Sequence, residues 1–309
     1  MGSDQANQPV TGCLMDVKRF AVHDGPGIRT TLFLKGCSLK CIWCHNPEGI
    51  AAKPELAYYA HKCIGCGECV VACARGAHEM TANGHVFHRE RCRACGACEA
   101  GCLGEALKLF GRPVTVAEAL KIALEDRIFM EHSGGGVTLS GGEPLRQADF
   151  CFELLRALKA EQISTAVDTC GQVGWEAFAK VLPVTDLFLY DIKHIDSARH
   201  RALTGQGNEL ILDNLRRLSE AGARIEIRLP LVPGCNDDPA TLAGIGRLLG
   251  GLRIEKMRVL PYHALARSKY QALGMPDTMP DASSPTDDDL NAAAAILQAL
   301  GVPAVSGRA

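Results

Sequence analysis

Short apolar, β-branched runs alternate along most of the chain with longer segments in which apolar residues recur every three or four positions. The first pattern is typical of buried strands and the second of amphipathic helices. Thr115, three residues before Glu118, predicts a capping box at the start of the first such helix. Strands that alternate with helices predict a parallel sheet with right-handed crossovers, and six such units favour an α/β fold with a partial (β/α)6 barrel over the closed form. The strands are predicted over residues 31–36, 136–139, 164–168, 186–191, 224–229 and 256–260, and the helices over residues 115–129, 148–159, 209–221, 239–249 and 287–300.

One segment interrupts this alternation. Residues 54–111 contain only short elements, are rich in cysteine and glycine, and include an internal repeat. We therefore expect an inserted second domain over residues 54–111 and a barrel formed by residues 13–53 and 112–309. The polar residues 1–12 are predicted to be a flexible N-terminus, and the Pro- and Asp-rich residues 276–289 a surface loop.

Length and charge exclude several classes of protein. The chain has 309 residues, enough for a large domain with a hydrophobic core of its own. Its formal net charge is −2 and it has no block of basic residues, so a nucleic acid partner is not expected. No apolar run reaches the roughly 18 residues of a membrane span, and the polar start differs from a signal peptide. We expect a cytoplasmic, monomeric protein that binds no membrane.

The cysteines indicate a metalloprotein. The chain has 15 cysteines, and 11 of them fall into three tight groups. A chain of this length does not need disulfides, and thiols two or three residues apart suit metal better than cross-links. The remaining four, Cys13, Cys151, Cys170 and Cys235, are interpreted as small buried hydrophobic residues.

The first group is Cys37, Cys41 and Cys44, which follow the first predicted strand in the pattern C-x3-C-x2-C. In a β/α barrel this places them at the C-terminal face, where active sites form. Three thiolates can hold three irons of a 4Fe–4S cluster, and without a fourth cysteine nearby the last iron keeps an open position, as catalytic metals do. The alternative is zinc with His45 as the fourth ligand. It is disfavoured because the adjacent Cys44 and His45 can hardly both reach one tetrahedral ion.

The other eight cysteines form two runs within the insertion, each with the spacing C-x2-C-x2-C-x3-C. This is the spacing of bacterial two-cluster ferredoxins, in which the fourth cysteine of each run ligates the other cluster. Zinc ribbons are the alternative, but they need two cysteine pairs separated by a longer spacer. Clusters with four protein ligands have no open iron, so we expect a role in electron relay or docking, between which the sequence does not choose. The predicted ligand sets of the two 4Fe–4S clusters are Cys63, Cys66, Cys69 and Cys102, and Cys92, Cys95, Cys98 and Cys73.

The three-cysteine motif and its flanks closely resemble a known family. With the following Asn46-Pro47-Glu48 and the preceding segment from His23 to Thr30, the motif is similar to the glycyl radical enzyme activases of the radical S-adenosylmethionine (SAM) superfamily. The resemblance implies that the open iron binds SAM and that a flavodoxin- or ferredoxin-type donor supplies the electron that cleaves it. The resulting 5′-deoxyadenosyl radical would abstract hydrogen from a glycine of a partner glycyl radical enzyme, which would enter near residues 23–30.

The same resemblance implies a set of cofactor contacts at the ends of successive strands. Glu143 would meet the amino group of SAM, and Lys193 and Arg228 its carboxylate. Where the family usually has Asn after the threonine of its cation site, this chain has Cys170. The SAM-binding residues would be Trp43, His45, Gly141, Gly142, Glu143, Asp191, Ile192, Lys193, Arg228 and His263, and a monovalent cation would be held by Asp168, Thr169 and the backbone of Leu189.

Two other functions agree with parts of this pattern. A radical SAM enzyme with a different substrate is disfavoured by the combination of residues 23–30 with the two-cluster insertion. A ferredoxin that uses the barrel as a docking scaffold is disfavoured because an electron carrier gains nothing from an open, oxygen-labile iron. The identity of the glycyl radical enzyme is not encoded here, because the pocket for the downstream substrate lies in that partner.

Overall fold

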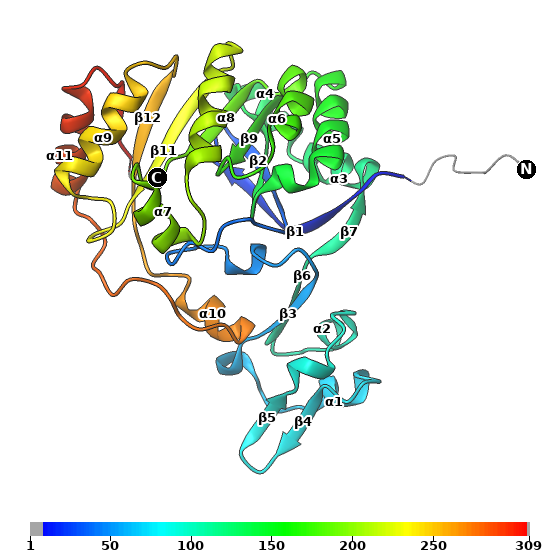
Figure 1. The fold of residues 1–309 in the computed structure, drawn as a ribbon. Coiled ribbons are helices and arrows are strands. Elements are labelled where there is room, and N and C mark those ends of the chain that lie inside the picture. Colours follow the sequence, from blue (N-terminus) through cyan, green and yellow to red (C-terminus); the bar gives the residue numbers. More distant parts are fainter. Residues whose placement is uncertain (1–8, 308–309) are drawn as a thin grey trace, which may run out of the picture.

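The computed structural model describes residues 9–307 and has as its largest element a nine-stranded sheet in the order β13-β12-β11-β10-β9-β8-β2-β1-β7 (Figure 1). In this spatial order, the strands from β13 to β2 run parallel to one another. Strand β1 is antiparallel to both of its neighbours, β2 and β7. The sheet is the open, partial barrel that the alternating pattern predicts. Its strands are β1 (Thr11–Ala21), β2 (Arg29–Leu34), β7 (Arg112–Thr115), β8 (Gly136–Gly141), β9 (Ser164–Thr169), β10 (Leu187–Asp191), β11 (Ile225–Leu231), β12 (Lys256–Pro261) and β13 (Ala304–Ser306).

Helices follow the parallel strands, and α5, α6, α8, α9 and α11 lie in a row on one side of the sheet (Figure 1). Each of the predicted strands and helices is present, but the predicted helix 115–129 is broken into α3 and α4. The capping box at Thr115 is confirmed, because its hydroxyl accepts from the Glu118 amide at 3.2 Å and the Glu118 carboxylate accepts from the Thr115 amide at 2.8 Å. The helices are α3 (Val116–Leu124), α4 (Arg127–Ser133), α5 (Ala148–Ala160), α6 (Trp175–Val181), α7 (Ser197–Thr204), α8 (Glu209–Glu220), α9 (Pro239–Leu249), α10 (Arg267–Leu273) and α11 (Asp287–Gln298). No helix within residues 9–307 has the length and apolar character needed to cross a bilayer.

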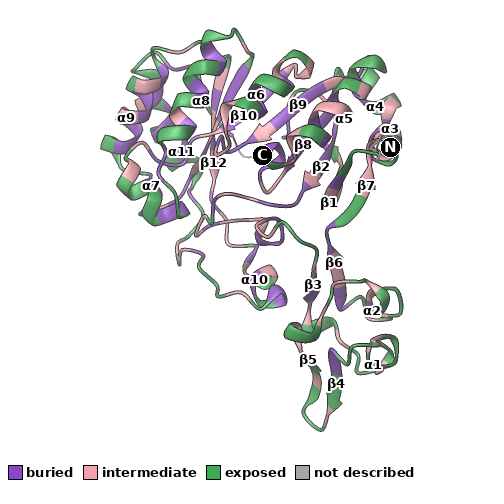
Figure 2. Cartoon of the chain, turned by 45° about the vertical axis from the view of Figure 1, so that its right-hand side comes forward, coloured by how far each residue is buried: buried purple, intermediate pink, exposed green. Residues whose placement is uncertain are grey.

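The main core lies between the sheet and these helices, where Figure 2 shows buried strands next to half-buried helices. Strand β8 illustrates it, since five of its six residues are buried. On the helix side, α5 contributes an apolar face at three- and four-residue spacing, which is why it packs on the sheet. The buried residues of that face are Phe150, Cys151, Leu154, Leu155 and Leu158.

Residues 55–110 form a separate lobe, called the small lobe, which lies below the sheet in Figure 1. Strands β3 (Glu55–Tyr58) and β6 (Leu107–Phe110) pair antiparallel, and β4 (His78–Thr81) and β5 (Gly84–Phe87) form a hairpin. The internal repeat gives two short helices, α1 (Glu68–Ala72) and α2 (Ala97–Ala100). Each begins after a glycine in the left-handed region, Gly67 with φ 79° and Gly96 with φ 80°.

Two cations, the buried Lys35 and the partly buried Arg89, attach the small lobe to the barrel. The ammonium of Lys35, whose side chain is fully buried, donates to the carbonyl of Glu48 at 2.7 Å and pairs with the Glu55 carboxylate at 2.9 Å. The guanidinium of Arg89 donates to a carbonyl of β3 and to the carbonyl of Ala272 in α10. The lobe is therefore held at both the start of its first strand and the side of α10.

The predicted surface loop and the predicted flexible N-terminus each differ in part from what the sequence indicates. Residues 276–286 form a loop as expected, but the loop is not confined to the surface. Met279 is buried, and the carbonyl of Pro280 accepts from the Tyr262 hydroxyl at 2.7 Å. The expected flexible N-terminus lies outside the described residues up to position 8, whereas Thr11 and Gly12 already belong to β1.

Arg29 joins three strands from inside the barrel. Its side chain is 1% exposed, and it donates to the Thr138 hydroxyl and the Val137 carbonyl, both at 2.7 Å, and to the Ser164 carbonyl at 3.1 Å. Burial lowers the pKa of Arg29 to about 10, so it remains charged at neutral pH. These contacts assign Arg29 a structural role at the N-terminal ends of β2, β8 and β9.

We expect Arg29→Met to lower the free energy of unfolding by about 3 kcal/mol or more, because each buried acceptor left without a donor costs about 1–3 kcal/mol. The exposed Arg156→Met, which removes only a surface pair with Glu153, is the control and should change stability by less than about 1 kcal/mol. Urea unfolding of the two variants measures both values. Equal midpoints for the two would contradict the structural role of Arg29.

Candidate active site

The cysteine loop, residues 36–50, follows β2 and carries Cys37, Cys41 and Cys44. At its neck the amide of Gly36 donates to the carbonyl of Gly49 at 2.8 Å. Further along, two more amides of the loop donate to carbonyls at the end of α7. The loop has little helix or strand of its own. Its shape is therefore fixed by these hydrogen bonds, at its neck and at the end of α7.

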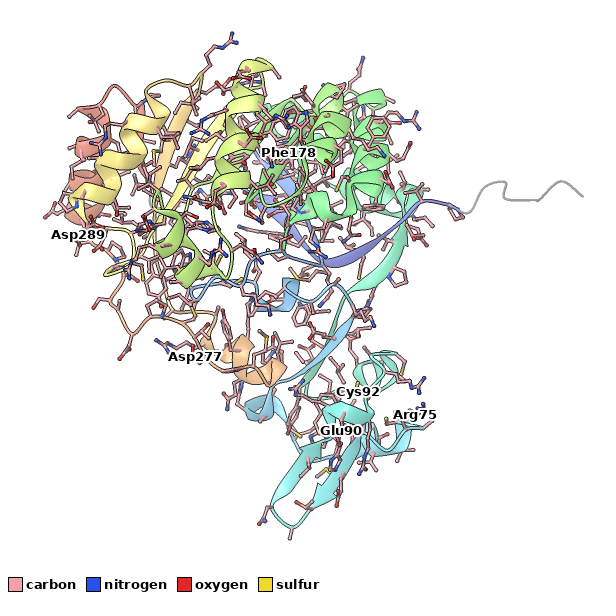
Figure 3. All side chains as sticks on the ribbon, viewed as in Figure 1. Arg75, Glu90, Cys92, Phe178, Asp277 and Asp289 are labelled. Carbon is pink, nitrogen blue, oxygen red and sulfur yellow. The ribbon has the colours of Figure 1, made fainter. Side chains whose placement is uncertain are left out.

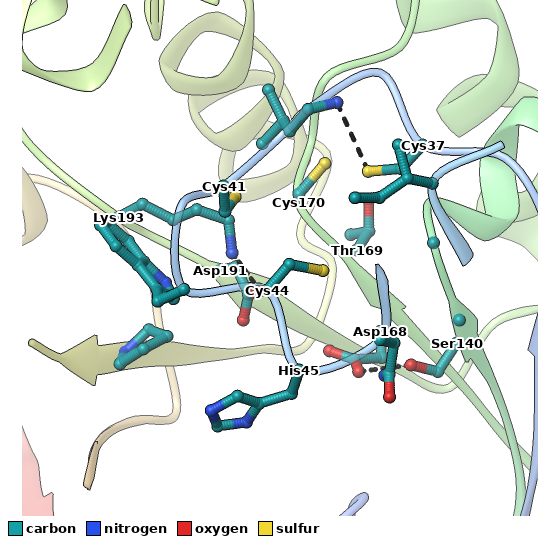
Figure 4. A pocket seen from close by; sticks show the side chains of 17 residues that line it. Cys37, Cys41, Cys44, His45, Ser140, Asp168, Thr169, Cys170, Asp191 and Lys193 are labelled. Carbon is teal, nitrogen blue, oxygen red and sulfur yellow. Dashed lines mark hydrogen bonds and ion pairs between the residues drawn. The ribbon is translucent and has the colours of Figure 1, made fainter. Parts of the chain in front are cut away.

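The three thiols face a cavity of about 190 Å³ at the C-terminal ends of the parallel strands (Figure 4). Most of the predicted site residues of the barrel line it, whereas Glu143, Leu189, Ile192, Arg228 and His263 do not. Sequence reasoning gave no role there to Leu39, Ile50 or Pro230, apolar residues that carry no chemical signal. The predicted residues in the lining are Cys37, Cys41, Trp43, Cys44, His45, Gly141, Gly142, Asp168, Thr169, Asp191 and Lys193.

The glycine pair after β8 lets backbone approach backbone. A Cβ atom on Gly142 would lie 2.4 Å from the carbonyl oxygen of Gly49 and 2.5 Å from that of Gly36. Gly141 has φ +124°, a conformation that favours glycine, and a Cβ atom there would lie 2.2 Å from the Leu34 oxygen. Both glycines are therefore required for this turn to pack against the backbone of β2 and of the cysteine loop.

Glu143 is fully buried and faces the end of β9. Its carboxylate accepts from the Thr169 hydroxyl and the Cys170 amide, both at 2.8 Å, and from the Leu145 amide at 3.1 Å. Burial raises the pKa of this carboxyl group, against the effect of these hydrogen bonds. In this conformation Glu143 fixes two residues of the cavity wall.

A chain of buried charges runs from the cavity to the segment before β2. The guanidinium of Arg228 lies 3.2 Å from the Asp168 carboxylate and 3.8 Å from that of Asp24. Asp168 also accepts from the Ser140 hydroxyl at 2.7 Å. Burial raises the pKa of Asp168, and the positive charge of Arg228 opposes that rise. Leu189 lies opposite Asp168 in the β9–β10 ladder, so the three predicted cation residues are close together.

Lys193 extends into the cavity from the end of β10. Its ammonium lies 2.8 Å from the Asp191 carboxylate, and its side chain is 10% exposed. Burial alone would lower the pKa of Lys193, but the Asp191 carboxylate raises it well above its usual range. The neighbouring Ile192 is buried and its amide donates to the Arg228 carbonyl, so it supports the strand.

His45 and His263 stack with ring centroids 3.8 Å apart. Burial lowers the pKa of His45 to about 4, so its imidazole is neutral at pH 7. Its Nε2 lies 2.8 Å from the His263 carbonyl oxygen. Because a carbonyl oxygen can only accept, this Nε2 carries the hydrogen of the neutral ring. Trp43 is buried in an apolar cluster with Tyr262 and Tyr270. The Tyr270 hydroxyl supports the cysteine loop by donating to the Cys44 carbonyl at 3.2 Å.

The thiols differ in their electrostatic surroundings. Burial raises the pKa of Cys41 to about 11 and that of Cys44 to about 12. A hydrogen bond from the Cys170 thiol lowers the pKa of Cys37. Cys170, interpreted from the sequence as a buried hydrophobic residue, is buried but also lines the cavity. Its place directly after Asp168-Thr169, at a strand end, is the signal that could have identified it.

The donor set fits the expected cofactors. Three cysteine thiols of one short loop face the same cavity, as a 4Fe–4S cluster with one open iron requires. The buried ammonium of Lys193 in the same wall suits a carboxylate. The apolar and aromatic residues of the cysteine loop complete the enclosure.

The eight cysteines of the small lobe, among them Cys92 (Figure 3), line two further cavities. Each cavity takes three cysteines of one run and the last cysteine of the other. Backbone amides point at several sulfurs, for example Ala77 at Cys73 and Ala106 at Cys102, at 3.4 and 3.2 Å. Four thiols with amide donors fit a saturated 4Fe–4S cluster. Cavity A is lined by Cys63, Cys66, Cys69 and Cys102, and cavity B by Cys73, Cys92, Cys95 and Cys98.

Residues 31–243 match the family model described as the radical SAM superfamily. This range contains the cysteine loop and strands β8 to β11. The chain belongs to the radical SAM superfamily. Among solved structures, a radical SAM methyltransferase from Sphaerobacter thermophilus is similar to 95% of the chain and 76% of its own, with a TM-score of 0.50 and 20% identity, which shows a shared fold.

Relatives within the superfamily are closer in sequence. An isethionate sulfite-lyase activating enzyme of Nitratidesulfovibrio vulgaris is 40% identical over 88% of this chain and 90% of its own. A choline trimethylamine-lyase activating enzyme of Oleidesulfovibrio alaskensis is 40% identical over 94% of this chain and 96% of its own. This radical SAM protein therefore belongs with them to the glycyl radical enzyme activating enzymes.

For this radical SAM protein without metal, we expect thiol alkylation to modify Cys66 and Cys95 first, since both are exposed, and Cys44 much later than either. Only the thiolate reacts, and the pKa of Cys44 near 12 keeps it protonated at pH 7.5. Its rate should rise about tenfold per pH unit between pH 8 and 10. Mass spectrometry after timed iodoacetamide treatment under anaerobic, reducing conditions measures the order. A Cys44 that reacts as fast as Cys66 would show that the loop is open in solution.

Proposed function

We propose that this chain installs a glycyl radical on a partner glycyl radical enzyme by means of SAM and three 4Fe–4S clusters. The observation that carries the proposal is the convergence of Cys37, Cys41 and Cys44 on a cavity that also contains a buried, charged Lys193. Thiols alone would suit many metals, but an ammonium beside three thiols suits a cluster that binds an amino acid cofactor. The activating-enzyme relatives extend over most of the chain and support the same reaction class.

The cluster and SAM, when bound, supply the radical chemistry. The chain would hold the cluster through its three thiolates and direct the SAM carboxylate to Lys193. His45, neutral and fixed by its hydrogen bond to the His263 carbonyl, and Trp43 would border the adenine. The buried wall from Ser140 to Asp168 would exclude water from the site.

Arg228 and Glu143 take a different place in this proposal from that implied by the resemblance. Arg228 is already paired with Asp168 and Asp24, so it would act on SAM by holding Asp168. Glu143 would hold Thr169 and Cys170 in the wall. A monovalent cation would be held by Asp168, Thr169 and the backbone of Leu189, which lies opposite Asp168 in the β9–β10 ladder.

The small lobe would carry two auxiliary clusters in a ferredoxin-like insertion, one in cavity A and one in cavity B. Its attachment supports a role beside the active site. Lys35 joins the start of the lobe to the carbonyl of Glu48 in the cysteine loop, and Lys269 of α10 pairs with the Glu48 carboxylate. Electrons would come from an external flavodoxin- or ferredoxin-type donor.

The partner segment would enter beside the segment that precedes β2. The carbonyl of His23 and the carboxylate of Asp24 both contact Arg228, which touches Asp168 in the cavity wall. A chain segment bound at residues 23–28 would therefore be two side chains from the cavity. This arrangement favours a protein substrate over a small molecule that diffuses into a closed barrel.

Mixing the reduced holoenzyme with SAM and candidate glycyl radical enzymes from the same genome should give the electron paramagnetic resonance (EPR) doublet of a glycyl radical. The holoenzyme should hold about twelve irons, and replacement of Cys37, Cys41 and Cys44 by Ala should remove about a third of the iron and all of the doublet. Cys235→Ala, outside all three groups, is the control and should keep both. A doublet formed by the triple variant would overturn the catalytic assignment, and consumption of a small molecule without a doublet would favour a different radical SAM reaction.

Replacement of Lys193 by Ala should weaken SAM binding by about ten- to a hundredfold, because a charge-assisted hydrogen bond is worth about 1.5–3 kcal/mol. The iron content should not change, since Lys193 is no cluster ligand. Lys180→Ala, on the surface of α6, is the matched control. Equilibrium binding of SAM to the anaerobic protein measures the effect, and unchanged affinity would show that Lys193 serves only to neutralise Asp191.

A further inference from the structure

Two histidines of the small lobe lie between its two thiol cavities. His85, on β5, lines cavity A, and His78, on β4, lines cavity B. Nδ1 of His78 lies 3.0 Å from Nε2 of His85, and the ring centroids are 5.1 Å apart. The pair therefore forms a hydrogen-bonded bridge from one cavity to the other.

The outer nitrogens of the pair have no partner. Nε2 of His78 and Nδ1 of His85 are buried and lack a hydrogen-bond partner among residues 9–307. Their other neighbours are aromatic, since His78 stacks on Phe87 and His85 meets the edge of Tyr58 at 4.5 Å between centroids. Buried polar atoms are almost always satisfied, so two orphans that border two cavities indicate partners that occupy those cavities.

The number of protons makes the bridge asymmetric. A hydrogen bond between two ring nitrogens needs one N–H donor and one lone-pair acceptor. Two neutral imidazoles carry two N–H groups, and one of these is used inside the pair. Burial disfavours a third proton. One outer nitrogen is therefore a donor, and the other can only accept.

We propose that His78 and His85 are positioning residues that give the two auxiliary clusters unequal reduction potentials, because the pair donates its single outward N–H to the cluster in one cavity and not to the other. Hydrogen bonds to cluster sulfurs raise the reduction potential. The cluster that receives this bond thus has the higher potential of the two. The inference rests on the proposed occupation of cavities A and B by clusters.

Two substitutions separate the inner from the outer nitrogens. The amide of Asn occupies the position of a histidine Nδ1, so His78→Asn keeps the inner contact and deletes the outer nitrogen. The amide of Gln occupies the position of Nε2, so His85→Gln does the same for His85. His88→Asn is the control, because His88 lies in the same lobe but bonds the surface carboxylate of Glu79.

The variants are made in the full chain with Cys37, Cys41 and Cys44 replaced by Ala, so that only the auxiliary clusters give signals. EPR-monitored potentiometric titration should resolve two midpoints in this parent. One of the two substitutions should make reduction of the cluster that it faces about tenfold less favourable, which corresponds to about 59 mV for one electron. The other substitution and His88→Asn should leave both midpoints in place.

Iron analysis separates failure of this inference from failure of the proposed clusters. About eight irons per parent chain with midpoints that neither His78→Asn nor His85→Gln moves would overturn the bridge and leave the clusters intact. Equal shifts of both midpoints by each variant would also overturn it. A single ion in place of the clusters would overturn both proposals. Such an ion could be held by Cys69 and the two histidines, whose ligand atoms lie within 4.8 Å of one another.

Discussion

Between the cysteine loop and the turn that follows β8, backbone meets backbone with no side chain in between. The amide of Glu143 donates to the carbonyl of Gly36 at 2.8 Å, and a Cβ atom on Gly142 would lie 2.5 Å from the same oxygen. This contact decides where the loop leaves β2 and so where its thiols lie relative to β9 and β10. Glu143, in the same turn, then fixes the end of β9. The cavity wall is therefore assembled outward from one tight turn.

Buried charges complete the site because each has a partner. Lys193 is paired with Asp191, and Arg228 lies between Asp168 and Asp24. Unpaired, any of these groups would be costly to bury, whereas paired they hold the strand ends at fixed spacing.

The sequence predicted well what depends on local pattern or on ligand spacing. The parallel strands are buried β-branched runs, and the cysteine spacing identified the thiols that share each of three cavities. It predicted poorly what depends on tertiary contact. Strand β13 has three residues, and β1 and the edge strand β7 carry exposed polar residues. The pairing of Arg228 with Asp168, and of His78 with His85, joins residues whose separation along the chain gives no periodic signal.

The attachment of the small lobe has an evolutionary consequence. Lys35 is buried between the Glu48 carbonyl and the Glu55 carboxylate, and Gly111, at the other end of the lobe, is so close that a Cβ atom there would lie 2.4 Å from the Lys35 side chain. A lineage that lost residues 55–110 by a single deletion would leave Lys35 without its counter-charge next to the cysteine loop. Gain or loss of the lobe thus requires a compensating change at position 35, and that position should differ between homologues with and without the lobe.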